Sequence, residues 1–252
     1  MSAAPPPAFH PHNAARHPKP RHVSTIASLH WLQDGWKNFL GAPAVWLAIS
    51  TIFFLMLFIL GLVPVLGWAV VLLGFPVMVA GMVLGCHAQH QGQSLRIEHL
   101  FAGLRTHAGN LALVGVFYLL GGLLAGLISV MVSGGALLTG YILGLLHGLG
   151  LTVISAVLLG SVIFTVLWVL LITALWFAAP LVVLRATPPL DAMKLSLQAC
   201  FNNFGAFAFL GILIYVLIWV AMIPAGLGVL VLIPVLAGTV YASYRDVFPT
   251  EG

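Results

Sequence analysis

Charged residues are scarce in this sequence, and their scarcity excludes an ordinary soluble domain. Only 6% of the 252 residues are Asp, Glu, Lys or Arg, whereas soluble domains carry roughly 25%. The formal net charge is +4, but the nine basic side chains are spread over the whole chain. They do not form the basic face that nucleic acid requires. The charge deficit is typical of a membrane protein, and we expect no nucleic acid among its partners.

Cysteine is scarce too, and this excludes a fold held together by disulfides. Cys86 and Cys200 are too few and too far apart in the sequence for a disulfide framework. Ionisable residues are also missing from the middle of the long apolar runs. A charge at that depth costs roughly 2.5 to 3.5 kcal/mol and marks function where it occurs. Because proton-coupled carriers and most intramembrane hydrolases need such groups, we expect no enzymatic activity and no cofactor.

Long apolar runs are what the chain does contain. Hydrophobic residues make up 62% of it, and the mean hydropathy is +1.14. Six runs approach the roughly 20 residues that cross a hydrocarbon core, at residues 44–62, 68–86, 111–133, 151–183, 206–223 and 227–241. The Gly-rich stretch 134–150 is at the lower limit for a crossing. We expect it to be re-entrant or interfacial, with a seventh span as the alternative.

An amphipathic stretch that ends at a glycine precedes each pair of runs. In residues 31–46, WLQDGWKNFLGAPAVW, Gly41 and Pro43 suit the end of one helix and the first turn of the next. Related stretches cover residues 94–110 and 190–207, where Gly109 and Gly205 take the place of Gly41. The sequence therefore predicts an all-α membrane protein with six transmembrane helices in three hairpins, each preceded by an interfacial amphipathic helix.

The chain divides into one membrane domain and two tails. Residues 1–23 are rich in Pro and His with little apolar periodicity, so we expect them to be disordered. Residues 249–252 form a short second tail. The domain between them covers residues 24–248, and its three units cover about 24–86, 94–183 and 190–244.

Basic residues indicate how the domain is oriented. With six spans, all nine basic residues fall on one side: Arg16, Lys19, Arg21, Lys37, Arg96, Arg105, Arg185, Lys194 and Arg245. The positive-inside rule therefore places both termini in the cytoplasm. Trp rings and cationic side chains prefer headgroup depth, and glycine and proline permit a bend there. We accordingly predict a set of membrane-interface residues, namely Trp31, Trp36, Lys37, Gly41, Pro43, Trp46, Arg96, Arg105, Lys194 and Arg245.

One short cluster has the residue types of a metal site. Cys86, His87 and His90 end the second run, and the i, i+4 spacing of Cys86 and His90 places both on one helical face, where a soft metal could bind. A metal site needs a full set of ligands, however. Packing at a helix end is therefore the preferred interpretation, and we predict no metal.

The two ends of the membrane region carry recognisable segments, WLQDGWKNFLGAPAVW and TVYASYRDVF. They resemble those of a family of uncharacterised multi-pass inner-membrane proteins of proteobacteria, and the resemblance covers most of residues 31–248. More remotely, LFAGLRTHAGN is similar to the repeated unit of the six-span membrane domain attached to some glycerophosphodiester phosphodiesterases. The spans occupy the chain and leave no phosphodiesterase domain, so that activity does not carry over. The resemblance implies an inner-membrane location and a multi-pass fold.

These features favour a non-enzymatic function. We expect an accessory, scaffold or envelope-homeostasis role in the inner membrane, with the lipid bilayer as a partner. A homo-oligomer and another membrane protein both remain open as partners. The alternative is a transporter or channel for a lipid or a small apolar solute, which a continuous polar pathway between the hairpins would favour.

Overall fold

A computed structural model describes residues 20–147 and 150–249, and every regular element in those ranges is a helix. Six helical segments of the described chain are long and apolar enough to cross a membrane. The predicted all-α, six-span fold is therefore confirmed. In chain order the elements are α1 (Ala27–Leu40), α2 (Pro43–Gly61), α3 (Leu66–His90), η1 (Ile97–Phe101), α4 (Ala102–Arg105), α5 (Ala108–His147), α6 (Gly150–Trp176), α7 (Ala178–Arg185), α8 (Pro189–Asn202), α9 (Phe204–Met222) and α10 (Val229–Val247).

The three hairpins are α2/α3, α5/α6 and α9/α10. The amphipathic helices before the first and third are α1 and α8, each of 14 residues. Pro43 occupies the first turn of α2, where its missing N–H costs nothing because no helical partner exists there. The middle elbow differs in form, since the 3₁₀ helix η1 and the single turn α4 replace one continuous helix.

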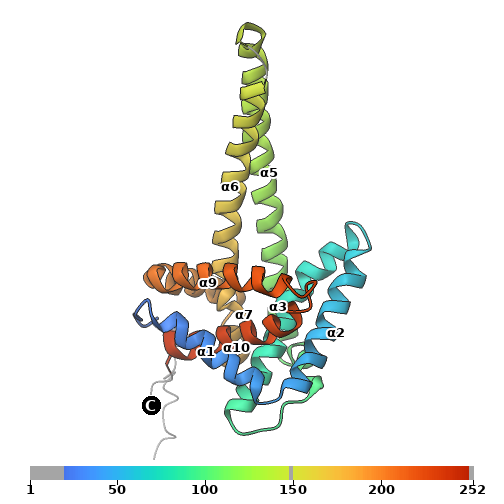
Figure 1. Cartoon of the computed structure of the whole chain (residues 1–252), viewed down its shortest axis with the longest axis vertical. Coiled ribbons are helices and arrows are strands. Elements are labelled where there is room, and N and C mark those ends of the chain that lie inside the picture. The colour runs from blue at the N-terminus through green and yellow to red at the C-terminus, as the bar shows by residue number, and fades with distance from the viewer. Residues whose placement is uncertain (1–19, 148–149, 250–252) are drawn as a thin grey trace, which may run out of the picture.

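The hairpins leave a common basal layer in different directions (Figure 1). This basal layer consists of α1, η1, α4, α7, α8 and the C-terminal parts of α3 and α10. The α5/α6 hairpin stands along the long axis of the molecule, α2/α3 leaves at one side, and α9 runs crosswise to α5 and α6. Within their most apolar stretches, 50% of α3 and 61% of α10 is buried, against 11% to 28% of the other four candidate spans. The core therefore lies in the basal layer.

Residues 134–147 of the stretch 134–150 are not a separate re-entrant, interfacial or spanning segment, and residues 148 and 149 lie outside the described residues. Helix α5 continues unbroken from Ala108 to His147, and α6 begins at Gly150. No proline lies between Pro76 and Pro180, and each glycine weakens a helix by only about 1 kcal/mol, so the local sequence does not stop α5. Its 40 residues extend about 60 Å, roughly twice the thickness of a hydrocarbon core.

Residues 21–23, at the end of the predicted tail, are bonded to the domain. Residues 1–19 lie outside the described residues, but Arg21 pairs with Asp246 and its N–H donates to the Val247 carbonyl at 2.8 Å. The buried Asn203 side chain accepts from Val23 N–H at 2.8 Å and donates to the Arg21 carbonyl at 3.0 Å. Hydrogen bonds thus hold the backbone at residues 21 and 23 to the domain, and the predicted disorder of residues 1–19 stays a prediction.

A serine breaks the fourth span at Phe177, where α6 passes into α7. The Ser196 hydroxyl of α8 donates to the Thr173 carbonyl at 2.6 Å and accepts from Phe177 N–H at 3.0 Å. These two backbone groups would otherwise bond to each other in a continuous helix, so the hydroxyl is inserted into the helical ladder. Pro180, which lacks a donor, lies directly after the break. The Cys200 thiol stands 3.8 Å from the same carbonyl, and burial raises its pKa to about 12.

We expect Ser196→Ala to lower the free energy of unfolding by about 2 kcal/mol, because two buried backbone groups lose their partner. The measurement is an unfolding curve of the purified protein in detergent. Ser161→Ala is the matched control, since the exposed Ser161 hydroxyl bonds only to the Leu158 carbonyl of its own helix, at 2.9 Å. Equal stability of the two variants would show that the Ser196 insertion contributes nothing.

Candidate functional site

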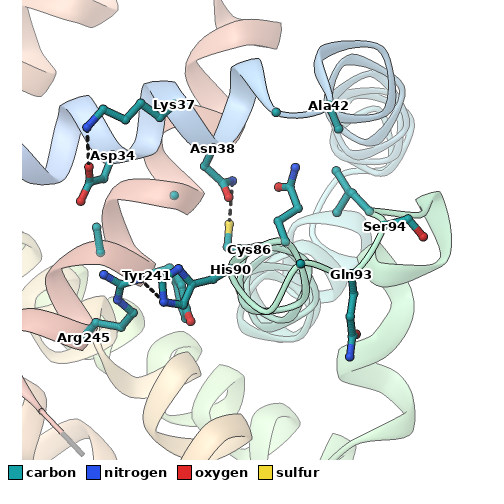
Figure 2. A pocket seen from close by; sticks show the side chains of 16 residues that line it. Asp34, Lys37, Asn38, Ala42, Cys86, His90, Gln93, Ser94, Tyr241 and Arg245 are labelled. Carbon is teal, nitrogen blue, oxygen red and sulfur yellow. Dashed lines mark hydrogen bonds and ion pairs between the residues drawn. The ribbon is translucent and has the colours of Figure 1, made fainter.

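A pocket of about 700 Å³, lined by both polar and apolar groups, opens in the basal layer between α1, α3 and α10 (Figure 2). The structure brings five sequence-predicted residues to its wall, from both the interface set and the metal candidates: Lys37, Gly41, Cys86, His90 and Arg245. Sequence reasoning missed the polar residues between them: Asn38, Gln89, Gln93 and Tyr241. Asn38 and Tyr241 lie within the two end segments, so these segments were the available signal.

A close crossing of α1 and α10 positions the charged rim of the pocket. A Cβ added to Gly35 would lie 2.3 Å from the Val235 carbonyl oxygen, and one added to Gly238 would lie 2.7 Å from Gly35 Cα. The two helices therefore touch backbone to backbone, which side chains would prevent. This contact places Lys37 of α1 and Arg245 of α10 on the rim of one pocket (Figure 2).

Arg245 is held against two rings. Its guanidinium carbon stands 5.6 Å from the Tyr241 ring centroid, and its Nη1 lies 2.7 Å from the ring nitrogens of His90. Because arginine only donates, the His90 nitrogen that pairs with it must accept, which requires a neutral imidazole. Arg245 thus contributes an uncompensated positive charge to the pocket.

Lys37 supplies the second cation. Its Nζ lies 3.2 Å from the Asp34 carboxylate one helical turn earlier, and both side chains are largely exposed. Such a surface pair is weak and is easily rearranged. The pocket therefore contains two cations, Lys37 and Arg245, against one carboxylate, and its net charge is positive.

A tryptophan orients one of the pocket amides. Trp46 is fully buried, and its indole N–H donates to Gln89 Oε1 at 2.9 Å. An indole can only donate, so it fixes the amide with Oε1 toward Trp46 and Nε2 on the opposite side. Gln89 Nε2 consequently lies beside Gly41, whose added Cβ would stand 3.2 Å away. Gln89 thus presents a donor at the pocket wall.

The metal candidates do not converge. Cys86 is buried and accepts from Asn38 Nδ2 at 3.3 Å, whereas His87 contacts Tyr241 OH through Nδ1 and Gln91 through Nε2, each at 2.9 Å. Over residues 20–147 and 150–249, no three His, Cys, Asp or Glu side chains form a group that could hold a metal ion. That the protein binds no metal stays a prediction.

Two of the predicted interface residues face the protein interior. Trp31 is 2% exposed and Trp46 is 0% exposed, so neither ring reaches headgroups. Their indole N–H groups have partners inside the fold: Trp31 donates to Asp246 at 3.0 Å, and Trp46 donates to Gln89. Aromatic enrichment near a span end thus does not separate interface anchors from core residues. Trp36, 47% exposed, keeps its interface role as a prediction.

Gly41 and the remaining predicted interface residues lie at the surface of the basal layer. Gly41 caps α1 with a φ of −66°, so its role is not the left-handed cap that glycine usually provides. The other predicted interface residues are exposed and lie in or beside the basal layer: Pro43, Arg96, Arg105 and Lys194. Arg96 pairs with Glu98 at 3.1 Å. Their contact with lipid headgroups stays a prediction.

The apolar residues of α1 and α8 lie on both the buried and the outward faces of these helices. On α8 the apolar residues Leu190 and Phe201 are exposed, and on α1 the residues Leu29 and Trp36 are exposed. The buried faces combine small residues, including Ala27, Ser28, Gly35, Ala192, Ser196 and Ala199, with the larger Trp31, Phe39 and Leu195. An outward apolar stripe on a helix of this kind fits one lying along the membrane surface.

Comparison with known proteins identifies a membrane relative. The chain is 25% identical over 232 residues to a protein of Burkholderia thailandensis named as a probable inner membrane protein, and the likeness covers 87% of this chain and 82% of that protein. No family model matches the chain, and no solved structure matches it. The remoter resemblance to the membrane domain attached to glycerophosphodiester phosphodiesterases finds no support here. With six apolar helices, the likeness identifies an integral, multi-pass membrane protein.

Proposed function

We propose that the protein is a non-enzymatic accessory or scaffold protein of the inner membrane, with a role in envelope homeostasis. The observation that carries this proposal is the arrangement of three hairpins on one basal layer (Figure 1). Four of the six candidate spans are 28% buried or less over their most apolar stretches. Such spans have most of their surface free to contact lipid or other membrane proteins.

A transporter or channel for a lipid or small apolar solute is the alternative. A carrier encloses its substrate site between helices near the middle of the membrane. Two smaller grooves, of about 280 Å³ between α5, α6 and α8 and about 140 Å³ between α2, α3, η1 and α4, are lined by apolar residues and share no residue with the basal pocket. They would suit an acyl chain. They are therefore compatible with a lipid or apolar cargo, but neither contributes polar residues to a pathway between the hairpins.

The test is purification of the tagged protein from native membranes in mild detergent, with the stoichiometric partners identified. Gly126→Leu on α5 is the informative variant, because a Cβ at Gly126 meets nothing within 4 Å. A scaffold predicts that this variant accumulates normally and loses a partner that contacts α5, while Gly211→Leu on α9, equally unobstructed, retains it. Purification without partners, together with solute flux in liposomes that contain the wild-type protein, would favour the transporter instead.

The same proposal places both termini in the cytoplasm. Of the nine basic residues, Arg16 and Lys19 are outside the described residues, and the other seven lie in or beside the basal layer. A reporter enzyme that is active only in the periplasm should therefore be active when fused after His147, at the end of α5, and inactive when fused at the C-terminus. The reverse pattern would place the basal layer on the periplasmic side.

A further inference from the structure

The basal pocket has features that a scaffold does not require. Two cations, Lys37 and Arg245, reach it from different helices, and the carboxylate on its wall, Asp34, already pairs with Lys37 at 3.2 Å. Neither cation is neutralised by a buried partner. A cavity that keeps two positive charges against one negative charge attracts an anion.

Neutral donors line the same cavity. Trp46 turns Gln89 so that its Nε2 lies on the side of Gly41, and Gln93 and Ser94 line the wall formed by the loop after α3 (Figure 2). Phosphate oxygens accept hydrogen bonds from guanidinium, ammonium, amide and hydroxyl groups alike. The combination therefore fits a phosphate group better than an apolar solute.

The length of α3 is compatible with this chemistry. Helix α3 has 25 residues and is about 37 Å long, whereas the hydrocarbon core is about 30 Å thick. Gln89 and His90 end this helix. In an α3 that crosses the bilayer, this polar end is the part expected to project beyond the hydrocarbon, which would bring the pocket to the level of the lipid phosphates.

We propose that the basal pocket binds a phosphate group, carried either by an anionic phospholipid headgroup or by a free phosphate compound. Lys37 and Arg245 pair with the phosphate oxygens, and the Gln89 amide donates a hydrogen bond from the α3 side. This site goes beyond the scaffold role, because the hairpins can hold partners whether the pocket is filled or empty.

Binding is measured on the purified full chain with two probes. In the lipid arm, phosphatidylglycerol is titrated into protein in neutral detergent and bound lipid is counted by native mass spectrometry, with phosphatidylcholine as the uncharged comparison. In the soluble arm, inorganic phosphate is titrated into protein in phosphatidylcholine nanodiscs by calorimetry. Retention of phosphatidylglycerol alone identifies a lipid site, and binding of inorganic phosphate identifies a site for a soluble anion.

Three variants separate the pocket from general charge effects. The double variant Lys37→Gln/Arg245→Gln removes both cations, and Gln93→Glu keeps the side-chain shape but adds a negative charge to the wall. We expect each to weaken binding at least about tenfold, whereas Lys194→Gln, which removes an exposed cation outside the pocket, leaves it unchanged. Gln93→Glu keeps the result interpretable if the double variant unfolds. Absence of binding in both arms, or an equal loss in Lys194→Gln, would overturn the proposal.

Discussion

Gly35→Ala is expected to lower the free energy of unfolding by about 3 kcal/mol, at the upper end of the usual range for overpacking. The added Cβ would meet the Val235 carbonyl oxygen at 2.3 Å and the Thr239 backbone nitrogen at 2.9 Å. Both are backbone atoms of α10, so no side chain can rotate away and the helices must separate. Because α1 and α10 form the centre of the basal layer, we also expect the variant to accumulate poorly.

Gly238→Ala should have a similar effect from the other side of the crossing, since its Cβ would stand 2.7 Å from Gly35 Cα. The double variant should cost less than the sum of the two single changes, because both act on one contact. Thermal unfolding in detergent and the amount of protein in membranes are the measurements.

Gly211→Ala on α9 and Gly74→Ala on α3 are the controls. Nothing lies within 4 Å of a Cβ at either position, so alanine should be neutral or should stabilise the helix by up to about 1 kcal/mol. If Gly35→Ala behaves like these controls, α1 and α10 do not cross as closely as described.

The predictable part of the fold was determined by local sequence. Runs of apolar residues long enough to span a bilayer need no tertiary information, because lipid rather than the rest of the chain covers them. The hairpins and the two 14-residue amphipathic helices followed from those runs and from Gly41 and Pro43. The continuous helix α5 was missed because the glycines of residues 134–150 were taken to end a span, although no proline interrupts the helix before His147.

The sequence could not indicate the features that depend on contacts between distant segments of the chain. The end of α6 looks continuous locally, yet Ser196 of α8 breaks it at Phe177. The basal pocket joins α1, the end of α3 and α10, so Lys37 and Arg245 belong to one site only because Gly35 and Gly238 let α1 and α10 cross. Each cation was predicted as an independent interface residue, and no local spacing relates them.

The sequence also does not indicate whether a tryptophan ring near a helix end is buried or exposed, and this difference leads to a large expected effect on stability. Both Trp36 and Trp46 lie near the ends of helices and look alike in sequence, but Trp36 is 47% exposed and Trp46 is 0% exposed. We expect Trp46→Ala to lower the free energy of unfolding by about 4 kcal/mol, because a large buried ring leaves a cavity. Trp36→Ala should cost less than about 1 kcal/mol in detergent, since its ring is half in contact with solvent or lipid.

Trp46→Phe separates packing from hydrogen bonding at the same position. Phenylalanine keeps most of the ring volume but removes the indole N–H that donates to Gln89 Oε1 at 2.9 Å. The expected loss is about 1 to 2 kcal/mol, and the freed Gln89 amide can then turn its donor away from the pocket. Trp46→Phe should therefore also weaken phosphate binding, whereas Trp36→Phe should leave it unchanged.

If Trp36→Ala is more destabilising than Trp46→Ala in unfolding curves, anchoring at the interface outweighs burial in this chain. If Trp46→Phe binds phosphate as the wild type does, Gln89 is not a ligand.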